Sequence, residues 1–137
     1  MPTEEIKTYQ LRKCKTFFIS LHLKTSKFNQ MEYKPRIADK MLAKKLASKG
    51  AILIEGPKWC GKTTTAEQQA KSILYMDNPA SLETNLQMAE IEPSVLLDGD
   101  TPRLIDEWQL APKLWDAIRF EVDHRHEVGQ FVLTGSA

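Results

Sequence analysis

A phosphate-binding motif stands near the middle of the chain. The stretch EGPKWCGKTTT fits the pattern G-x-x-x-x-G-K-[ST] with Gly56, Gly61, Lys62 and Thr63. The glycines let a loop bring its backbone N–H groups close to phosphate oxygens, where a Cβ would intrude. We expect Lys62 to be an exposed charge that reaches the β- and γ-phosphates, and the Thr63 hydroxyl to face Mg²⁺. The predicted phosphate-contacting residues are Gly56, Pro57, Lys58, Trp59, Cys60, Gly61, Lys62, Thr63 and Thr64.

Two adjacent carboxylates, Asp106 and Glu107, follow the apolar residues Leu104 and Ile105. At the carboxyl end of a buried strand they would lie where ligands of open α/β sheets bind. We expect Asp106 to hold Mg²⁺, directly or through its water, opposite Thr63. Glu107 can take a proton from an attacking water, which is the chemistry of nucleotide hydrolysis.

Two hydroxyls, Thr134 and Ser136, stand at the end of the last apolar run. We expect the final strand of a parallel α/β sheet to lie between the strand that carries the loop and the strand that carries the acidic pair. The tip of this final strand would then point to the γ-phosphate and the attacking water. We favour Ser136 over Thr134 as the sensor of the γ-phosphate, because a turn at Gly135 would carry it towards the nucleotide. A capping role for both hydroxyls stays open.

Other reactive side chains have less specific patterns. Cys14 and Cys60 lie far apart without metal-ligand spacing, which predicts free thiols in a reducing, cytoplasmic compartment. We interpret Cys60 as a small residue that fits the loop. His124 and His126 form an H-x-H pair that is typical of a solvated helix end more than of a metal site. Trp108, next to the acidic pair, is expected to pack first and to contact a ligand second.

Composition and charge exclude several classes of protein. The chain has 137 residues, 27% of them charged and 42% hydrophobic, with a formal net charge of +1. No apolar run approaches the roughly 20 residues that a membrane helix needs. Residues 1–30 carry six Lys/Arg against two Glu, and residues 31–137 carry 13 Lys/Arg against 16 Asp/Glu. The charge therefore does not indicate a general affinity for nucleic acid.

Strand and helix signals alternate along the chain, which predicts a parallel sheet covered on both faces. The predicted strands are 51–54, 73–76, 103–106 and 130–134, and the predicted helices between them are 64–72, 81–92 and 113–123. Ser81 is a plausible N-cap. Another helix should precede the first strand, with Ile37, Met41, Leu42 and Leu46 at helical spacing and Gly50 as its C-cap.

Residues 1–30 mix basic residues with the apolar patch Phe17–Ile19 and show no sustained periodicity. The patch is too short for a secretory signal. We expect a disordered N-terminal extension, and Met31 is an alternative start of translation.

Four sequence blocks resemble the AAA-type P-loop ATPases of bacteria and archaea whose full chains add a C-terminal domain of unknown function. They are YKPRIADKMLAKKL, GPKWCGKTTTAEQQA, PRLIDEWQLAPKLWDAIRFEVDHR and GQFVLTGSA, and they cover about residues 31–137. The resemblance implies an ASCE-type ATPase, an α/β P-loop NTPase-type three-layer sandwich with parallel strand order 1-4-3-2. It assigns Walker A to Gly56–Thr63, Walker B to the run ending at Asp106 and Glu107, and sensor 1 to Thr134–Ser136.

This sequence departs from that family in two ways. Residues 1–30 have no counterpart, and the chain stops at Ala137, before a fifth strand, any arginine finger and the C-terminal domain. We therefore expect a truncated AAA-type ATP-binding domain at 31–137, with strand 51–55 left as an exposed sheet edge. Such an edge predicts self-association, marginal stability and weak nucleotide binding. Without an arginine finger, hydrolysis should be very slow.

Two functional hypotheses follow. The first is an Mg²⁺-dependent ATPase domain that binds ATP and ADP. The alternative is a nucleotide-binding switch or interaction module without turnover. A phosphotransferase is disfavoured, because the pair Asp106 and Glu107 suits water activation. The sequence has no Asn/Thr-Lys-x-Asp guanine signature, which favours adenine.

Overall fold

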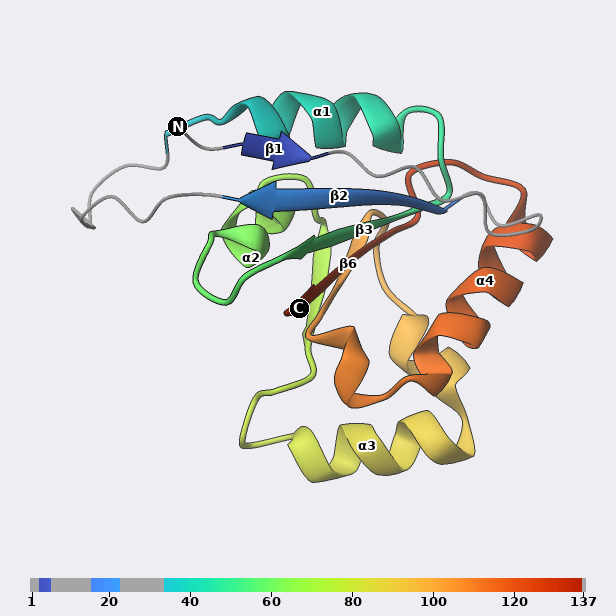
Figure 1. Cartoon of the computed structure of the whole chain (residues 1–137). Helices are drawn as coiled ribbons and strands as arrows, with labels where there is room; N and C mark the ends of the chain where they lie inside the picture. Colours follow the sequence, from blue (N-terminus) through green and yellow to red (C-terminus); the bar gives the residue numbers. More distant parts are fainter. Residues whose placement is uncertain (1–2, 6–15, 23–33, 137) are drawn as a thin grey trace.

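The computed structural model describes residues 3–5, 16–22 and 34–136. In this part of the chain one six-stranded sheet has the order β1-β2-β3-β6-β5-β4 (Figure 1). The strands are β1 (Thr3–Glu5), β2 (Thr16–His22), β3 (Ala51–Gly56), β4 (Ser72–Tyr75), β5 (Arg103–Asp106) and β6 (Phe131–Ser136). All neighbouring strands are parallel except β1 and β2, which are antiparallel.

The predicted fold class is confirmed. The strands expected from the sequence appear as β3, β4, β5 and β6, and they lie in the order β3-β6-β5-β4, which is the predicted order 1-4-3-2. Their carboxyl ends therefore meet at one edge of the sheet. The phosphate-loop motif follows β3, the acidic pair ends β5, and the two hydroxyls end β6.

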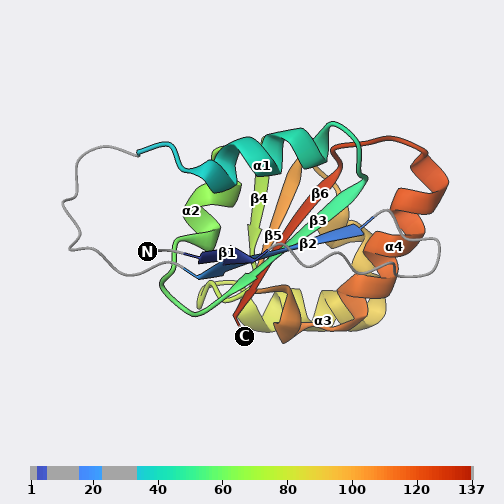
Figure 2. The same cartoon turned by 45° about the horizontal axis from the view of Figure 1, so that its top comes forward.

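Helices cover both faces of the sheet (Figure 2). On one face lie α1 (Ile37–Leu46) and α2 (Lys62–Glu67), and on the other lie α3 (Leu82–Ile91), the 3-10 turn η1 (Pro93–Leu97) and α4 (Lys113–Arg125). A second 3-10 turn, η2 (Trp108–Leu110), follows β5.

Alternation along β3 divides the core between the two layers. Ile52 and Ile54 pack with α1 and α2, whereas Ala51 and Leu53 pack with α3 and α4. Successive side chains of a strand point to opposite faces, so a fully covered strand reads as a continuous apolar run. Leu104 and Ile105 of β5 divide in the same way. Burial of one such side chain contributes about 1.5–3 kcal/mol.

Two local predictions were wrong. Helix α2 ends at Glu67 instead of continuing to Ser72, because the chain turns to join the sheet: the Lys71 N–H donates to Pro102 O at 2.8 Å. The C-cap of α1 is Ala47, not Gly50. A Cβ on Gly50 would lie 2.4 Å from Val122 Cγ1, so this glycine allows close approach to α4.

The strand that carries the phosphate loop is not a sheet edge, contrary to our expectation. Strand β2 pairs with β3 in parallel, from Thr16 opposite Ala51 to Ser20 opposite Glu55. An unpaired β3 would present backbone N–H and C=O groups without partners, and a β-prone segment such as TFFISLH can satisfy them. Self-association through an exposed β3 edge loses its basis in this structure.

Candidate functional site

The loop between β3 and α2 has two left-handed residues. Gly61 is the N-cap of α2 and has φ 92°, a torsion that glycine adopts at low cost. Trp59 has φ 67°, and the residue is 79% exposed. The Lys58 ammonium lies 5.4 Å from the centre of the Trp59 ring. The loop thus turns tightly and carries its two largest side chains, Lys58 and Trp59, on its outside.

Lys62 is buried, which corrects the expectation of an exposed charge. The residue is 4% exposed, and Nζ donates to Gly56 O and to Pro57 O, each at 3.0 Å. A buried ammonium needs such partners because it loses its water. Lys62 therefore folds back over the loop and ties its start to α2.

Asp106 is the centre of the acidic site. The residue is 5% exposed, and its Oδ1 accepts hydrogen bonds from Thr63 Oγ1 at 2.6 Å and from Thr134 Oγ1 at 2.5 Å. The structure thus brings together three residues that the sequence predicted, from α2, β5 and β6.

Glu107 has an unusual backbone conformation. Its φ and ψ are 56° and 46°, a left-handed conformation that costs a non-glycine residue energy and occurs often at active sites. Its Oε1 accepts a hydrogen bond from Ser136 Oγ at 3.2 Å, and its Oε2 accepts one from Gln109 Nε2. Ser136 and Thr134 therefore each hold one member of the acidic pair.

The route by which Ser136 reaches Glu107 differs from the predicted one. No turn occurs at Gly135, because β6 continues to Ser136, which lies opposite Gly56 of β3. A Cβ on Gly135 would lie 3.0 Å from Gln109 Oε1 and 3.0 Å from Trp108 Nε1. Gly135 thus leaves room for these two side chains.

Sequence reasoning assigned no role to Gln109. It stands two residues after Glu107, and the 3-10 turn η2 brings its amide back to the Glu107 carboxylate. A spacing of two residues across a tight turn was the available signal.

A comparison with protein families agrees with this arrangement. The model of a family described as AAA domain matches residues 48–137. The chain belongs to this AAA-domain family. No curated protein and no solved structure matched the chain. The family supports nucleotide binding at the general level, and the match spans the loop, the acidic pair and the hydroxyls of β6.

Tyr75 lies next to the acidic site of the AAA domain. It is paired with Asp106 in the register of β4 and β5, and its hydroxyl donates to Glu67 Oε1 at 2.5 Å. This hydrogen bond is the largest cause that raises the pKa of Tyr75 to about 12, followed by burial and by the charges of Glu67 and Asp106. Tyr75 is therefore a neutral donor that ties α2 to β4.

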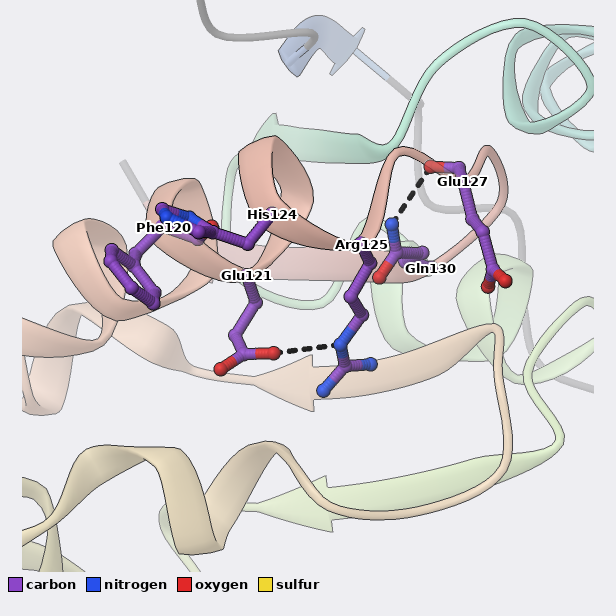
Figure 3. A network of polar contacts seen from close by, with 6 residues as sticks. All are labelled: Phe120, Glu121, His124, Arg125, Glu127 and Gln130. Atoms are coloured by element: carbon purple, nitrogen blue, oxygen red, sulfur yellow. Dashed lines mark hydrogen bonds and ion pairs between the residues drawn. The ribbon is translucent and has the colours of Figure 1, made fainter.

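The remaining residues that the sequence singled out, Trp108, His124 and His126, have packing or helix-end positions in the AAA domain. Trp108 packs against the core, with its ring centroid 5.2 Å from that of Trp115, in agreement with its predicted packing role. His124 stacks on Phe120 at 3.7 Å between ring centroids, and its Nδ1 lies 2.8 Å from Phe120 O (Figure 3). His126 is the left-handed C-cap of α4.

Figure 3 also shows how the end of α4 is fixed. Arg125 pairs with Glu121 at 2.7 Å, and Gln130 Nε2 donates to Glu127 O at 2.8 Å. The first contact lies within α4, and the second spans the turn before β6.

Cys60 is a buried free thiol in the AAA domain, whereas Cys14 and Met31 lie outside the described residues. Within residues 3–5, 16–22 and 34–136, no group of three or more His, Cys, Asp and Glu side chains gathers as a metal site. Over the same described ranges, no helix has the length and apolarity needed to cross a membrane.

Proposed function

We propose that this AAA domain binds ATP together with Mg²⁺ and hydrolyses the nucleotide. The observation that carries the proposal is the convergence of Thr63 and Thr134 on one oxygen of Asp106, at 2.6 and 2.5 Å. It joins the first turn after the phosphate loop to the ends of β5 and β6, where a nucleotide of an open α/β sheet would lie.

The residues present fit Mg²⁺ and a nucleotide phosphate. Mg²⁺ prefers oxygen ligands and is commonly bound through one or two carboxylates with substrate phosphates. Thr63 Oγ1 and the Asp106 carboxylate are such oxygens, and they already touch. We expect these two residues to hold the ion and the backbone N–H groups of residues 57–64 to hold the phosphates. Bound Mg²⁺ would neutralise negative charge on the phosphate oxygens.

Lys62 can exchange partners without losing hydrogen bonds. Its ammonium donates to Gly56 O and Pro57 O, and phosphate oxygens offer acceptors of the same kind with a full charge. We expect Lys62 to leave at least one of these carbonyls for the nucleotide.

Glu107 is the proposed general base, and its Oε atoms would accept the proton of the attacking water. Ser136 and Gln109 donate to its two oxygens. These contacts fix the direction of the carboxylate but also engage both of its oxygens. That engagement favours, as a second candidate, a domain that binds nucleotide without turnover.

Isothermal titration with ATP tests the binding step. We expect binding with Mg²⁺, weaker binding with EDTA, and loss of the Mg²⁺ effect in Asp106→Asn. A folded chain that does not bind ATP either with Mg²⁺ or with EDTA would contradict the proposal. Phosphate release, measured on the same preparation under single-turnover conditions, separates the two candidates, because binding without release indicates the switch.

A further inference from the structure

Arg36 stands outside the phosphate-loop motif, at the N-cap of α1. Its backbone is fixed on both sides: the Arg36 N–H donates to Asp39 Oδ2 at 2.6 Å, and Arg36 O accepts the Asp39 N–H at 3.1 Å. Helix α1 itself is anchored, because Ala38, Leu42 and Leu46 pack in one cluster with Cys60 and Ala66. The start of α1 is thus held firmly against the phosphate loop and α2.

The Arg36 side chain reaches the phosphate loop. Its Nη1 donates to Cys60 O at 3.3 Å. A Cβ built on Gly61 would lie 2.1 Å from Arg36 Nη1 and 2.9 Å from Cζ. The guanidinium therefore occupies the space that any larger residue would need at position 61. Position 61 thus favours glycine for two reasons, its φ of 92° and the close approach of Arg36.

The contact fixes the direction of one peptide group. In a planar trans peptide the C=O and N–H bonds point in opposite directions. Because Arg36 holds the carbonyl of Cys60, the N–H of Gly61 is directed away from the guanidinium. In the described part of the chain, this N–H donates to no backbone carbonyl. A charged donor on the carbonyl also polarises the amide and makes its N–H a stronger donor.

We propose that Arg36 is a positioning residue of the phosphate loop, which sets the Cys60–Gly61 peptide so that the Gly61 N–H meets the β-phosphate of a nucleoside di- or triphosphate. This inference rests on the proposed nucleotide binding. It assigns Arg36 no direct contact with the nucleotide, so its effect should pass through the peptide group alone.

The first test observes that peptide without any ligand. In protein labelled with ¹³C and ¹⁵N, Arg36→Ala should shift the carbonyl carbon of Cys60 and the amide nitrogen of Gly61. Lys40→Ala is the matched control, because Lys40 is an exposed residue of the same helix and its loss changes the net charge equally. Unchanged resonances in Arg36→Ala would overturn the inference.

The second test measures affinity for ADP and AMP by isothermal titration. Loss of one hydrogen bond to a charged phosphate acceptor corresponds to a weakening of about 10-fold or more. We expect that loss for ADP in Arg36→Ala and only a small change for AMP, which lacks a β-phosphate. Arg36→Lys should recover part of the affinity, and Lys40→Ala should stay within about twofold of the parent. Ligand-free melting of each variant checks that the fold is kept.

The outcomes separate this inference from the proposed function. A parent chain that fails to bind ADP would overturn both. A parent that binds ADP, with Arg36→Ala binding equally well, would overturn the role of Arg36 alone. Equal losses for ADP and AMP in Arg36→Ala would also contradict it, because they would indicate a general disturbance of the site.

Discussion

Thr134 Oγ1 of β6 donates a hydrogen bond of 2.5 Å to Asp106 Oδ1 of the neighbouring strand β5. The two residues are paired in the parallel register of these strands, so the sheet itself sets the contact. Thr134 is fully buried and Asp106 is 5% exposed. A carboxylate this deeply buried depends on its hydroxyl donors, because unpaired buried charge is costly.

We predict that Thr134→Val destabilises the fold as well as the site. The valine keeps the shape but removes one donor from Asp106, and loss of a hydrogen bond to a charged group costs about 1.5–3 kcal/mol. The free energy of unfolding, measured with urea, should fall by that amount. Thr84→Val, at an exposed position of α3, should change it by about 0.5 kcal/mol or less. Equal values for the two variants would contradict the role of Thr134.

Lys62→Ala should abolish nucleotide binding and should also loosen the loop. The ammonium bridges Gly56 O and Pro57 O. Its removal leaves both carbonyls without this donor, a structural role of Lys62 that the sequence motif does not indicate. We expect no heat of ATP binding and faster amide hydrogen exchange in residues 56–61. Lys44→Ala is the control, because it removes an exposed lysine of α1 that lies outside the predicted phosphate-contacting residues. Retained ATP affinity in Lys62→Ala would exclude the phosphate-loop assignment.

Glu107→Gln should keep Mg²⁺-ATP binding and remove turnover. The amide preserves the shape of the side chain but cannot accept a proton as a base. Binding is measured by titration and turnover by phosphate release. If the variant releases phosphate as fast as the parent, another residue activates the water.

Much of the fold could be predicted from the sequence because its signals are local. The fully covered strands read as apolar runs, and the phosphate-loop motif fixed the strand before it and the helix after it. Asp106, Thr63 and Thr134 could be assigned to one site because strand ends of a parallel sheet meet at the same edge.

Contacts between distant segments could not be read in the same way. The hydrogen bond from Arg36 to Cys60 joins residues 24 positions apart, and neither residue type indicates it. The burial of Lys62 depends on the path of the loop carbonyls, which a motif does not specify. The pairing of β2 with β3 was missed because TFFISLH is a short run flanked by basic residues. This run forms a strand because the free side of β3 offers backbone hydrogen-bonding groups with which it can pair.

Tyr75 gives a pH-dependent prediction. Its pKa is raised from 10.0 to about 12, so the folded chain holds the phenol proton more tightly than the unfolded chain. The stabilisation is complete below pH 10 and is lost as the pH rises from 10 to 12. Since the residue is 38% exposed, solvent screening limits it to about 1 kcal/mol or less.

Tyr75→Phe removes the hydroxyl and with it this pH-dependent stabilisation. The variant should be less stable than the parent at about pH 8, and the difference in free energy of unfolding should narrow between about pH 10 and pH 12. Glu67→Gln should show the same trend, because Glu67 is the acceptor of the Tyr75 hydroxyl. A difference that stays constant with pH would indicate a loss of packing alone.

Strand β2 determines whether β3 is an edge of the sheet. Its ladder runs along β3 from Ala51 to Glu55, directly before the phosphate loop. Deletion of residues 1–22 removes both N-terminal strands, so β3 would present unpaired backbone groups to solvent or to another chain.

We expect the chain without residues 1–22 to melt at a lower temperature, to self-associate with rising concentration, and to bind ATP more weakly, because β3 positions the loop. Light scattering coupled to size exclusion, thermal melting and titration measure these effects. Deletion of residues 1–15 is the matched control, because it removes β1 and keeps the β2 segment that pairs with β3. If the two deletions give the same melting temperature, association and ATP affinity, β2 does not support the loop. Only the longer deletion leaves β3 without β2 as its partner.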